Sequence, residues 1–323
     1  MIKIKLECWW TDTPSLNERM KRQFIPNEDL KKYSLVNENP DYTIIFGRTD
    51  WNRIETSKEN TFYISQEPLW SPNEPKDNIH TYCSKILISD KKEYPDREEY
   101  IETLLPMFYG GSGEIDNRPE WDWSLSLKDK DYVKNKIISI IVRKDGSEHY
   151  THLSNPLTSK INYSNRVNLA IQLSDNEKID IFGIYWKNNG KNIKGDIWNK
   201  HVGLDEYSFS VACENSIQKN YISEKFWDVI LTDSVPIYLG CSNITDYIPS
   251  NCFISLNEMS LEEMIKTIDD VIYNQLDYYN FYIDNIKLLK QEFFKNPKYN
   301  LWERIKYEIE LSEKNIINNK VLD

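Results

Sequence analysis

The chain has 323 residues, with 40 Lys and Arg against 51 Asp and Glu, which leaves a formal net charge of −11. One average domain has roughly 100–200 residues, so this length predicts two domains that each bury a core. With 40% hydrophobic residues and only 10 Gly and 13 Pro, the chain is neither disordered nor collagen-like. Its negative charge has the wrong sign for neutralising phosphates, so we expect no nucleic-acid partner.

The sequence shows no membrane, disulfide or metal pattern. No apolar run reaches the roughly 18–20 residues that cross a membrane, and the start lacks a signal-peptide core. We therefore expect a cytoplasmic protein without a membrane span, and a peripheral membrane contact is left open. The five cysteines form no CxxC pair, which predicts reduced thiols. His149 and His152 form an HxxH pattern without a nearby acidic ligand, so no metal site is predicted.

Short runs rich in Ile, Val, Phe and Tyr predict buried strands of two α/β sheets. The runs of the first series are 2–10, 42–47, 61–66 and 85–89. After a polar stretch, the second series contains 136–142, 179–183, 206–213 and 235–240. We place the domain boundary between residues 130 and 131, which divides the chain into domains 1–130 and 131–323.

Helices are predicted between the strands of the second series, over 163–174 and 224–232. Strand and helix thus alternate as in a parallel, doubly wound sheet. Ser260 and Glu263 have the spacing of a capping box, followed by apolar residues at helical spacing, and predict a helix from Leu261 onward. Two further helical stretches end the chain. The second has one apolar face that we expect to pack in the core, marked by Trp302, Ile305, Ile309 and Ile316.

The segment 209–240 carries the most chemical information, because the sequence has neither GxGxxG nor a Walker A loop. In it a strand ends at Glu214-Asn215-Ser216, and Ser223 can cap a helix that begins at Glu224-Lys225. Helix-start N–H groups attract anions, and Lys225 adds a full charge where a pyrophosphate could sit. From spacing alone, a solvated helix start with a Glu-Lys ion pair remains the alternative.

This segment closely resembles the donor-binding motif of the α-1,3/α-1,4-fucosyltransferases, glycosyltransferase family 10. The match consists of 214–216, 221–225, Val235-Pro236 and Gly240, and 248–256 resembles the continuation. It is strongest over 206–275 and weaker upstream to about residue 136. The resemblance implies a GT-B fold: two Rossmann-like, doubly wound α/β domains facing a cleft, with C-terminal helices. Domain 1–130 would bind the acceptor, and 131–323 the GDP-sugar donor.

The resemblance also implies an activity, namely inverting transfer of a sugar from a GDP-sugar to a hydroxyl of a glycan acceptor. L-fucose is the expected sugar, and no metal or cofactor is expected. Lys225 would neutralise the diphosphate, and Glu224 would hydrogen-bond the donor sugar. Asn215 and Tyr221 would line the nucleotide pocket. Protein cations would then stabilise the leaving diphosphate in place of a metal.

A second cation is expected on the first helix of the donor domain, where the family has an arginine. Arg166 occupies the corresponding stretch, and a guanidinium fork suits phosphate oxygens. Arg143 is the rival, because it follows a predicted strand at the end where doubly wound sheets bind ligands.

The acceptor hydroxyl needs a base, which the family draws from a strand end in the N-terminal domain. Glu67 fits this position, because it follows the strand 61–66 and precedes Pro68. Glu74 and Glu93 are the rivals. Three aromatic side chains could form a sugar-stacking wall or could be core residues instead: Trp9, Trp10 and Trp70.

Two departures from the family leave alternatives open. Cys213 replaces the usual Phe before Glu-Asn-Ser, which permits another GDP-sugar such as a deoxyhexose or a heptose. The divergent first domain leaves the acceptor unidentified, and we expect a bacterial surface polysaccharide or lipooligosaccharide. A non-catalytic glycan- or nucleotide-binding protein is the alternative from another class. Asp129-Lys130-Asp131 has the spacing of a DxD metal motif, but no strand precedes it, which favours solvated charge.

Overall fold

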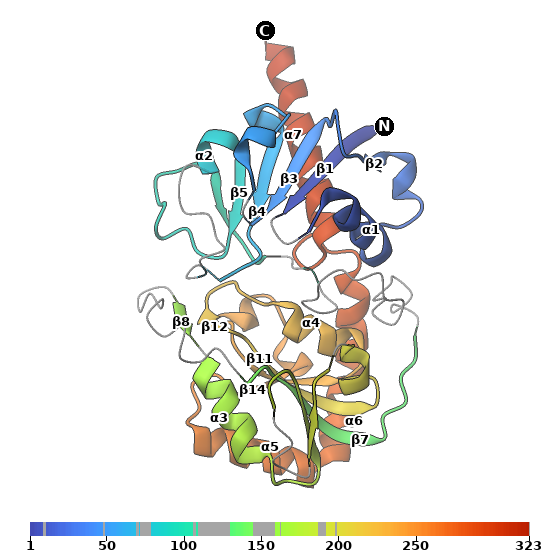
Figure 1. The fold of residues 1–323 in the computed structure, drawn as a ribbon, viewed down its shortest axis with the longest axis vertical. Coiled ribbons are helices and arrows are strands. Elements are labelled where there is room, and N and C mark those ends of the chain that lie inside the picture. Colours follow the sequence, from blue (N-terminus) through green and yellow to red (C-terminus); the bar gives the residue numbers. More distant parts are fainter. Residues whose placement is uncertain are drawn as a thin grey trace.

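Two parallel sheets organise the protein, one above the other in Figure 1. The computed structural model describes residues 1–8, 11–47, 49–68, 71, 79–105, 108, 130–144, 159–161, 163–186, 192–197 and 199–322. Within these residues each sheet has six strands, and every strand pair within the two sheets is parallel. The prediction of two parallel α/β domains is therefore confirmed.

The first sheet has the strand order β2-β1-β3-β4-β5-β6. Its strands are β1 (Ile2–Cys8), β2 (Tyr33–Leu35), β3 (Tyr42–Phe46), β4 (Thr61–Ile64), β5 (Lys85–Ile88) and β6 (Tyr100–Glu102). All five residues of β3 are buried, as expected for a parallel strand covered on both faces. The four predicted runs appear as β1, β3, β4 and β5, whereas β2 and β6 are too short to give a pattern.

Helices α1 (Thr13–Gln23) and α2 (Ile79–Tyr82) belong to the first domain. Asp12 caps α1 by accepting from the Ser15 N–H at 2.9 Å. The helix was not predicted, because Leu16 and Met20 are its only buried apolar side chains. Two apolar residues make too narrow a stripe for the helical period to be recognised.

The second sheet has the strand order β10-β9-β7-β11-β13-β14. Its strands are β7 (Lys136–Ile141), β9 (Ile179–Phe182), β10 (Ile193–Gly195), β11 (Tyr207–Cys213), β13 (Val235–Leu239) and β14 (Ile254–Ser255). The predicted runs of the second series appear as β7, β9, β11 and β13. A separate antiparallel pair is formed by β8 (Ser159–Ile161) and β12 (Ser216–Gln218).

In the described part of the second domain, four α-helices accompany the sheet: α3 (Tyr163–Leu173), α4 (Glu224–Leu231), α5 (Leu261–Tyr273) and α6 (Gln275–Phe293). The predicted capping box is present at the start of α5. There Ser260 N donates to Glu263 Oε2 at 2.7 Å, and Glu263 N donates to Ser260 Oγ at 3.3 Å. Helix α3 packs against α5, and α4 packs against α6.

The carboxyl ends of the two sheets face each other across the domain junction. Ser89 follows β5, and its side chain accepts a buried hydrogen bond of 2.8 Å from Gln218 Nε2 at the end of β12. The Ser89 carbonyl accepts from Asn220 Nδ2 at 2.7 Å. Glu102, the last residue of β6, pairs with Lys219. The segment after β12 is therefore bonded to the first domain.

Helix α7 (Leu301–Leu322) crosses from the second domain to the first, behind the first sheet in Figure 1. Trp302, Ile305 and Ile309 are fully buried, so these three residues of the predicted apolar face pack in the core. The side chain of the fourth, Ile316, lies outside what the structure describes. Trp302 meets the Tyr33 ring edge to face at 5.4 Å. The division by sequence assigns α7 to the second domain, but the helix contacts the first, and the boundary at residues 130 and 131 stays a prediction.

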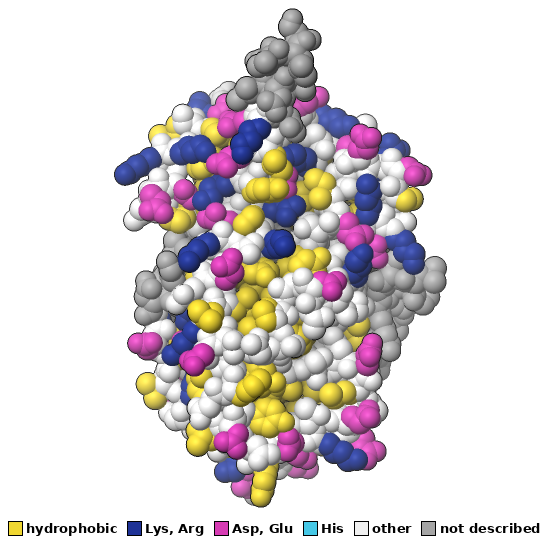
Figure 2. Space-filling model, turned by 180° about the vertical axis from the view of Figure 1, so that it is seen from behind, with side chains coloured by type: hydrophobic (Ala, Val, Ile, Leu, Met, Phe, Trp, Pro, Cys, Tyr) yellow, Lys and Arg dark blue, Asp and Glu magenta, His cyan; other side chains and the backbone are white. Residues whose placement is uncertain are grey.

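Charged side chains of both signs alternate over the back of the molecule, with apolar ones between them (Figure 2). Three exposed apolar residues of the protein lie on helix α6, namely Leu276, Phe281 and Leu288. The described residues of this face thus form no patch of a single charge. In the part of the chain that the structure describes, no helix is long and apolar enough to cross a lipid bilayer.

Replacing Glu308 should strongly destabilise the attachment of α7. Its nearly buried carboxylate pairs with Lys85 at 2.8 Å and with Arg304 at 2.9 Å. Removing one partner leaves buried charges uncompensated, so we expect Glu308→Gln to lower the free energy of unfolding by about 3–5 kcal/mol.

Glu310→Gln is the matched control on the same helix, because Glu310 pairs with Lys32 at the exposed surface. It should cost about 0–1 kcal/mol. Urea unfolding measures both variants, and equal losses would contradict a special role for Glu308.

Candidate active site

The candidate site lies where the second sheet changes direction. After β7 the chain builds β9 and β10 on one side, then returns to build β11, β13 and β14 on the other. Neighbouring strands β7 and β11 therefore diverge in their onward connections at their carboxyl ends. Open α/β sheets bind ligands at such a switch point. The segment after β11 is the one that carries the predicted donor motif.

A short path leads from β11 to α4 through this point. Glu214 follows β11 directly and is fully buried, and Asn215 leads into β12. The chain then touches the first domain before it returns to Ser223, which caps α4. Ser223 Oγ accepts from the Lys225 N–H at 3.3 Å. The predicted cap and the predicted helix start at Glu224 are both confirmed.

Glu224 and Lys225 form an ion pair of 2.9 Å on the first turn of α4. Lys200 approaches Glu224 at 3.7 Å and pairs with Asp228 at 2.5 Å. Burial alone would raise the pKa of Glu224, but Lys225 and Lys200 outweigh it and hold that pKa well below its usual range. Glu224 is therefore a stable carboxylate that can accept a hydrogen bond from a ligand hydroxyl.

Lys225 keeps its charge at this partly buried position. Burial lowers the pKa of its ammonium, but Glu224 and Glu214 raise it more, and the net shift is upward. Its Nζ lies 3.2 Å from Ser223 Oγ and 3.9 Å from Glu214 Oε2. About a fifth of the side chain is exposed, so a ligand can reach it.

The structure joins Arg166 to Asn215, two of the predicted donor residues. Arg166 Nη1 donates to Asn215 Oδ1 at 2.5 Å, and the arginine is buried on α3. Arg166 is also close enough to lower the pKa of Lys225. Tyr221, the fifth predicted donor residue, is buried in the loop before Ser223.

The rival Arg143 follows β7 at the same edge, but its side chain is exposed. Its guanidinium lies over the Tyr185 ring, at 5.1 Å from the ring centre. Arg166 thus contacts the donor motif through Asn215, and Arg143 contacts Tyr185 in the loop after β9.

Glu214 binds the N-cap residue of α4, Ser223, through both carboxylate oxygens. Its Oε1 accepts from Ser223 N at 2.7 Å, and its Oε2 accepts from Ser223 Oγ at 2.5 Å. Burial raises the pKa of this carboxyl, and the charge of Lys225 opposes the rise. A Cβ on Gly240 would lie 2.4 Å from Glu214 Cγ, so this distant residue of the motif leaves space for the glutamate.

Cys213 closes β11 as a buried thiol. Burial raises its pKa to about 12, so the group stays neutral and acts as a small apolar side chain. The Cys213 side chain is therefore smaller than the Phe that the family has at this position.

Glu67 lies in the other domain, in a bend after β4, and is half-buried. Its carbonyl accepts from Ser65 Oγ at 3.1 Å, and the neighbouring Gln66 accepts from Phe108 N. Because Glu67 follows the carboxyl end of β4, it lies at the edge of the first sheet that faces the second domain. The rival Glu93 is exposed in the turn after β5. The other acceptor-side predictions lie outside the described residues: Trp9, Trp10, Trp70 and Glu74.

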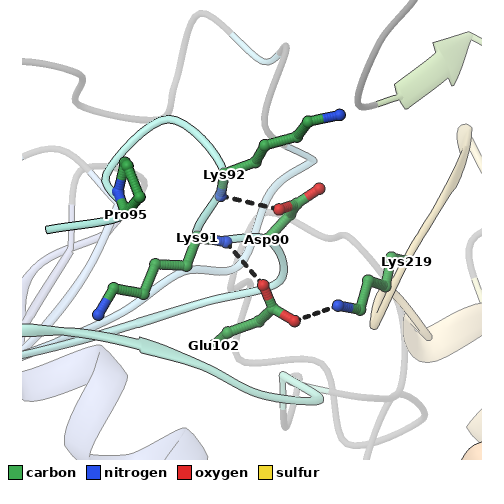
Figure 3. A pocket seen from close by; sticks show the side chains of 6 residues that line it. All are labelled: Asp90, Lys91, Lys92, Pro95, Glu102 and Lys219. Atoms are coloured by element: carbon green, nitrogen blue, oxygen red, sulfur yellow. Dashed lines mark hydrogen bonds and ion pairs between the residues drawn. The ribbon is translucent and has the colours of Figure 1, made fainter.

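An open hollow of about 520 Å³ lies at the domain junction, lined from the first domain by Asp90, Lys91, Lys92, Pro95 and Glu102, and from the second by Lys219. Figure 3 shows Glu102 between the Lys91 N–H, which donates to it at 3.0 Å, and the Lys219 ammonium. None of the predicted site residues lines this hollow. The ion pair of Glu102 and Lys219 in this hollow joins the two domains beside the loop between Glu214 and Ser223.

Among the residues that the structure describes, no three His, Cys, Asp or Glu side chains converge as a metal site requires. Asp129 of the DxD-like stretch lies outside the described residues, and Lys130 pairs with Asp205. The anionic ligand that the described site can accommodate would meet Lys225, Arg166 and the first turn of α4.

The sequence-based list of site residues omitted Lys200 and the buried role of Glu214. Lys200 lies in a short 3-10 turn before β11, where no spacing rule connects it with Glu224. Glu214 belongs to the donor-binding motif, and a carboxylate that directly follows a buried strand is expected to bind neighbouring hydrogen-bond donors. Its partner Ser223 was recognised only as a helix cap.

A family model of glycosyltransferase family 10 (fucosyltransferase), C-terminal part, matches residues 149–303. The 4-galactosyl-N-acetylglucosaminide 3-alpha-L-fucosyltransferase 9 of Mus musculus is 32% identical over 133 residues, which are 39% of this chain and 34% of that protein. The GDP-fucose protein O-fucosyltransferase 3 of Xenopus laevis is 41% identical over 51 residues, 16% of this chain and 11% of that protein. The chain thus spans about a third or less of these relatives. The family resemblance is confirmed.

Solved structures share the fold at low sequence identity. A crystal structure of alpha1,3-fucosyltransferase has a TM-score of 0.50 and 17% identity, covering 88% of this chain and 80% of that one. A crystal structure of alpha1,3-fucosyltransferase with GDP also has a TM-score of 0.50, with 16% identity and coverage of 91% and 88%. The predicted GT-B fold, two parallel-sheet α/β domains, is confirmed.

Proposed function

Because residues 149–303 match the family model of glycosyltransferase family 10, we propose that this protein transfers a sugar from a GDP-sugar to a hydroxyl of a glycan. L-fucose is the proposed sugar, since the family description and both sequence relatives name fucosyltransferases. The observation that carries the proposal is the assembly of Arg166, Asn215, Glu224 and Lys225 at the switch point of the second sheet. These residues come from two helices and one loop.

The proposed reaction uses the two facing sheet edges. The acceptor oxygen attacks the anomeric carbon while the bond from that carbon to GDP breaks, and GDP leaves with the electron pair. Lys225 and Arg166 would stabilise the negative charge that develops on the diphosphate. Glu67 would take the proton of the acceptor hydroxyl as the new bond forms. Attack from the side opposite the diphosphate makes the transfer inverting, and no metal is needed in this scheme.

Glu224 and Asn215 would orient the donor. A carboxylate held ionised by two lysines can accept a hydroxyl hydrogen bond of the sugar. Asn215 is fixed by Arg166, so the amide and the guanidinium would meet the nucleotide as one unit. Tyr221 would line the same pocket. A bacterial surface polysaccharide or lipooligosaccharide as the acceptor, and a cytoplasmic location, remain predictions of the sequence.

Cys213 supports a second candidate donor. The small, neutral thiol stands where the family has Phe, so another GDP-activated deoxyhexose or a heptose would find more room there. Turnover of individual GDP-sugars distinguishes these donors from GDP-L-fucose.

We expect GDP to bind and UDP not to bind in calorimetric titration of the whole chain. Equal affinity for both nucleotides would contradict the donor proposal.

With a GDP-sugar and acceptor, release of GDP should continue in EDTA, because protein cations supply the charge. Complete loss of activity in EDTA, restored by a divalent metal, would contradict the metal-independent scheme. Binding of GDP-sugars without any release of GDP would indicate a non-catalytic binding protein.

Lys225→Ala should weaken GDP binding more than Asn215→Ala does. A charge-assisted phosphate contact contributes about 1.5–3 kcal/mol, against about 0.5–1.5 for a neutral hydrogen bond. These values predict increases in Kd of about 10–150-fold and about 2–10-fold. Lys266→Ala is the matched control, since Lys266 is an exposed lysine of the same domain paired with Glu262. An unchanged Kd in Lys225→Ala would remove Lys225 from the site.

Glu67→Gln should abolish transfer while GDP affinity stays at the wild-type value. The amide keeps the shape of the side chain but not its basicity, and general-base catalysis contributes about 10²–10⁴-fold in rate. Glu93→Gln, at the exposed rival, should keep its activity. Both variants need the thermal stability of the wild type. More than about a tenth of wild-type turnover in Glu67→Gln would disprove the assignment.

A further inference from the structure

The buried carboxylate of Glu214 faces hydrogen-bond donors from two elements. Both of its oxygens accept from Ser223, one from the backbone N–H at 2.7 Å and one from the hydroxyl at 2.5 Å. Tyr238 on β13 donates to Oε1 at 3.4 Å, and its own oxygen accepts from Cys241 N at 2.9 Å. An ionised carboxylate is an acceptor only, so it suits this surrounding.

The hydroxyl of Ser223 is fully used in this arrangement. A serine hydroxyl has one hydrogen and two acceptor lone pairs. The hydrogen goes to Glu214, which leaves both lone pairs for Lys225. The Lys225 backbone N–H donates to this oxygen at 3.3 Å, and the Lys225 ammonium donates at 3.2 Å. The contact with Glu214 thus orients the hydroxyl, and the hydroxyl contacts both the backbone and the ammonium of the lysine.

We infer that Glu214 is a positioning residue of the donor site, which acts through Ser223 to hold the Lys225 ammonium where the diphosphate of the donor binds. This inference rests on the proposed function. Glu214 is fully buried beneath the start of α4, so it acts on the ligand through Lys225.

Glutamine cannot replace Glu214 in this role, although it has the same shape. Its amide has one acceptor oxygen and one NH₂ group, so one of the two Ser223 donors would face another donor. If the amide turned its NH₂ toward the hydroxyl, the Ser223 oxygen would accept from the amide. Fewer lone pairs would then remain for Lys225. Either orientation loosens the contact between Ser223 and Lys225.

The test compares GDP affinity in Glu214→Gln, Lys225→Met and the double variant by calorimetry. Glu214→Gln should weaken GDP binding about tenfold, the scale of one lost hydrogen bond to a charged group. Because Glu214 acts through Lys225, the double variant should bind GDP within about twofold of Lys225→Met alone. Ser223→Ala removes the hydroxyl between the two residues. It should also weaken binding about tenfold, and it provides the test if Glu214→Gln does not fold.

Asp233→Asn is the matched control, because Asp233 is a buried carboxylate of the same domain, paired with Lys290 at 2.9 Å. It should lower stability without changing GDP affinity. Amide hydrogen exchange at Ser223 should accelerate in Glu214→Gln and not in Asp233→Asn.

Three outcomes would overturn the inference while the proposed function stands. They are wild-type GDP affinity in Glu214→Gln despite faster exchange at Ser223, wild-type affinity in Ser223→Ala, and additive losses in the double variant. Wild-type protein that binds no GDP would instead overturn the proposed function, and this inference with it.

Discussion

Charge compensation at the start of α4 is the constraint on which the candidate site depends. Acidic and basic side chains alternate there in a chain of ion pairs: Glu214, Lys225, Glu224, Lys200 and Asp228. Buried charges are strongly destabilising unless each has a partner, so none of these side chains can move alone. The chain of pairs therefore holds the lysines in place before any ligand arrives. Such preorganisation is what electrostatic stabilisation of a leaving group requires.

The same loop also connects the two domains. Between Glu214 and Ser223 the backbone leaves the second sheet, and Gln218 and Asn220 bond to Ser89 at the end of β5. Asn220 has a φ of +55°, a left-handed conformation that asparagine tolerates well. Its Oδ1 accepts from Tyr247 and Asn243, so the turn is held from both domains. A movement of the first domain would therefore reach the residues that flank the donor motif.

Helix α7 makes a second connection at the far side of the molecule. Trp302 donates to Asp29 at 2.7 Å, and Lys306 pairs with the same carboxylate. Lys85, at the start of β5, is held by Glu308. Strand β5 is thus bonded to α7 at its start, through Lys85, and its end leads to Ser89, which bonds to Gln218 and Asn220. Helix α7, which follows the second sheet along the chain, is therefore bonded to the first domain.

The sequence alone determined the features that depend on neighbouring residues. Apolar runs predicted eight of the central strands, the Ser260 box predicted the start of α5, and the spacing of Ser223 and Lys225 predicted the cap of α4. Each of these rests on a periodicity or a short-range hydrogen bond, which a sequence displays directly. The donor motif was recognised as a resemblance for the same reason, because its residues are close along the chain. Short strands such as β2 and β6 left no pattern.

Only the tertiary structure decided which distant residues meet. It joined Arg166 to Asn215, whereas the rival Arg143 went to a tyrosine ring. It brought Lys200 to Glu224, and it packed Trp302 of α7 against Tyr33 of the first domain. These contacts join residues 20 or more positions apart, and they follow from the order of strands in the sheets and the direction of the connections between them. No local propensity encodes that order, because it is set by how whole elements cover each other's apolar faces.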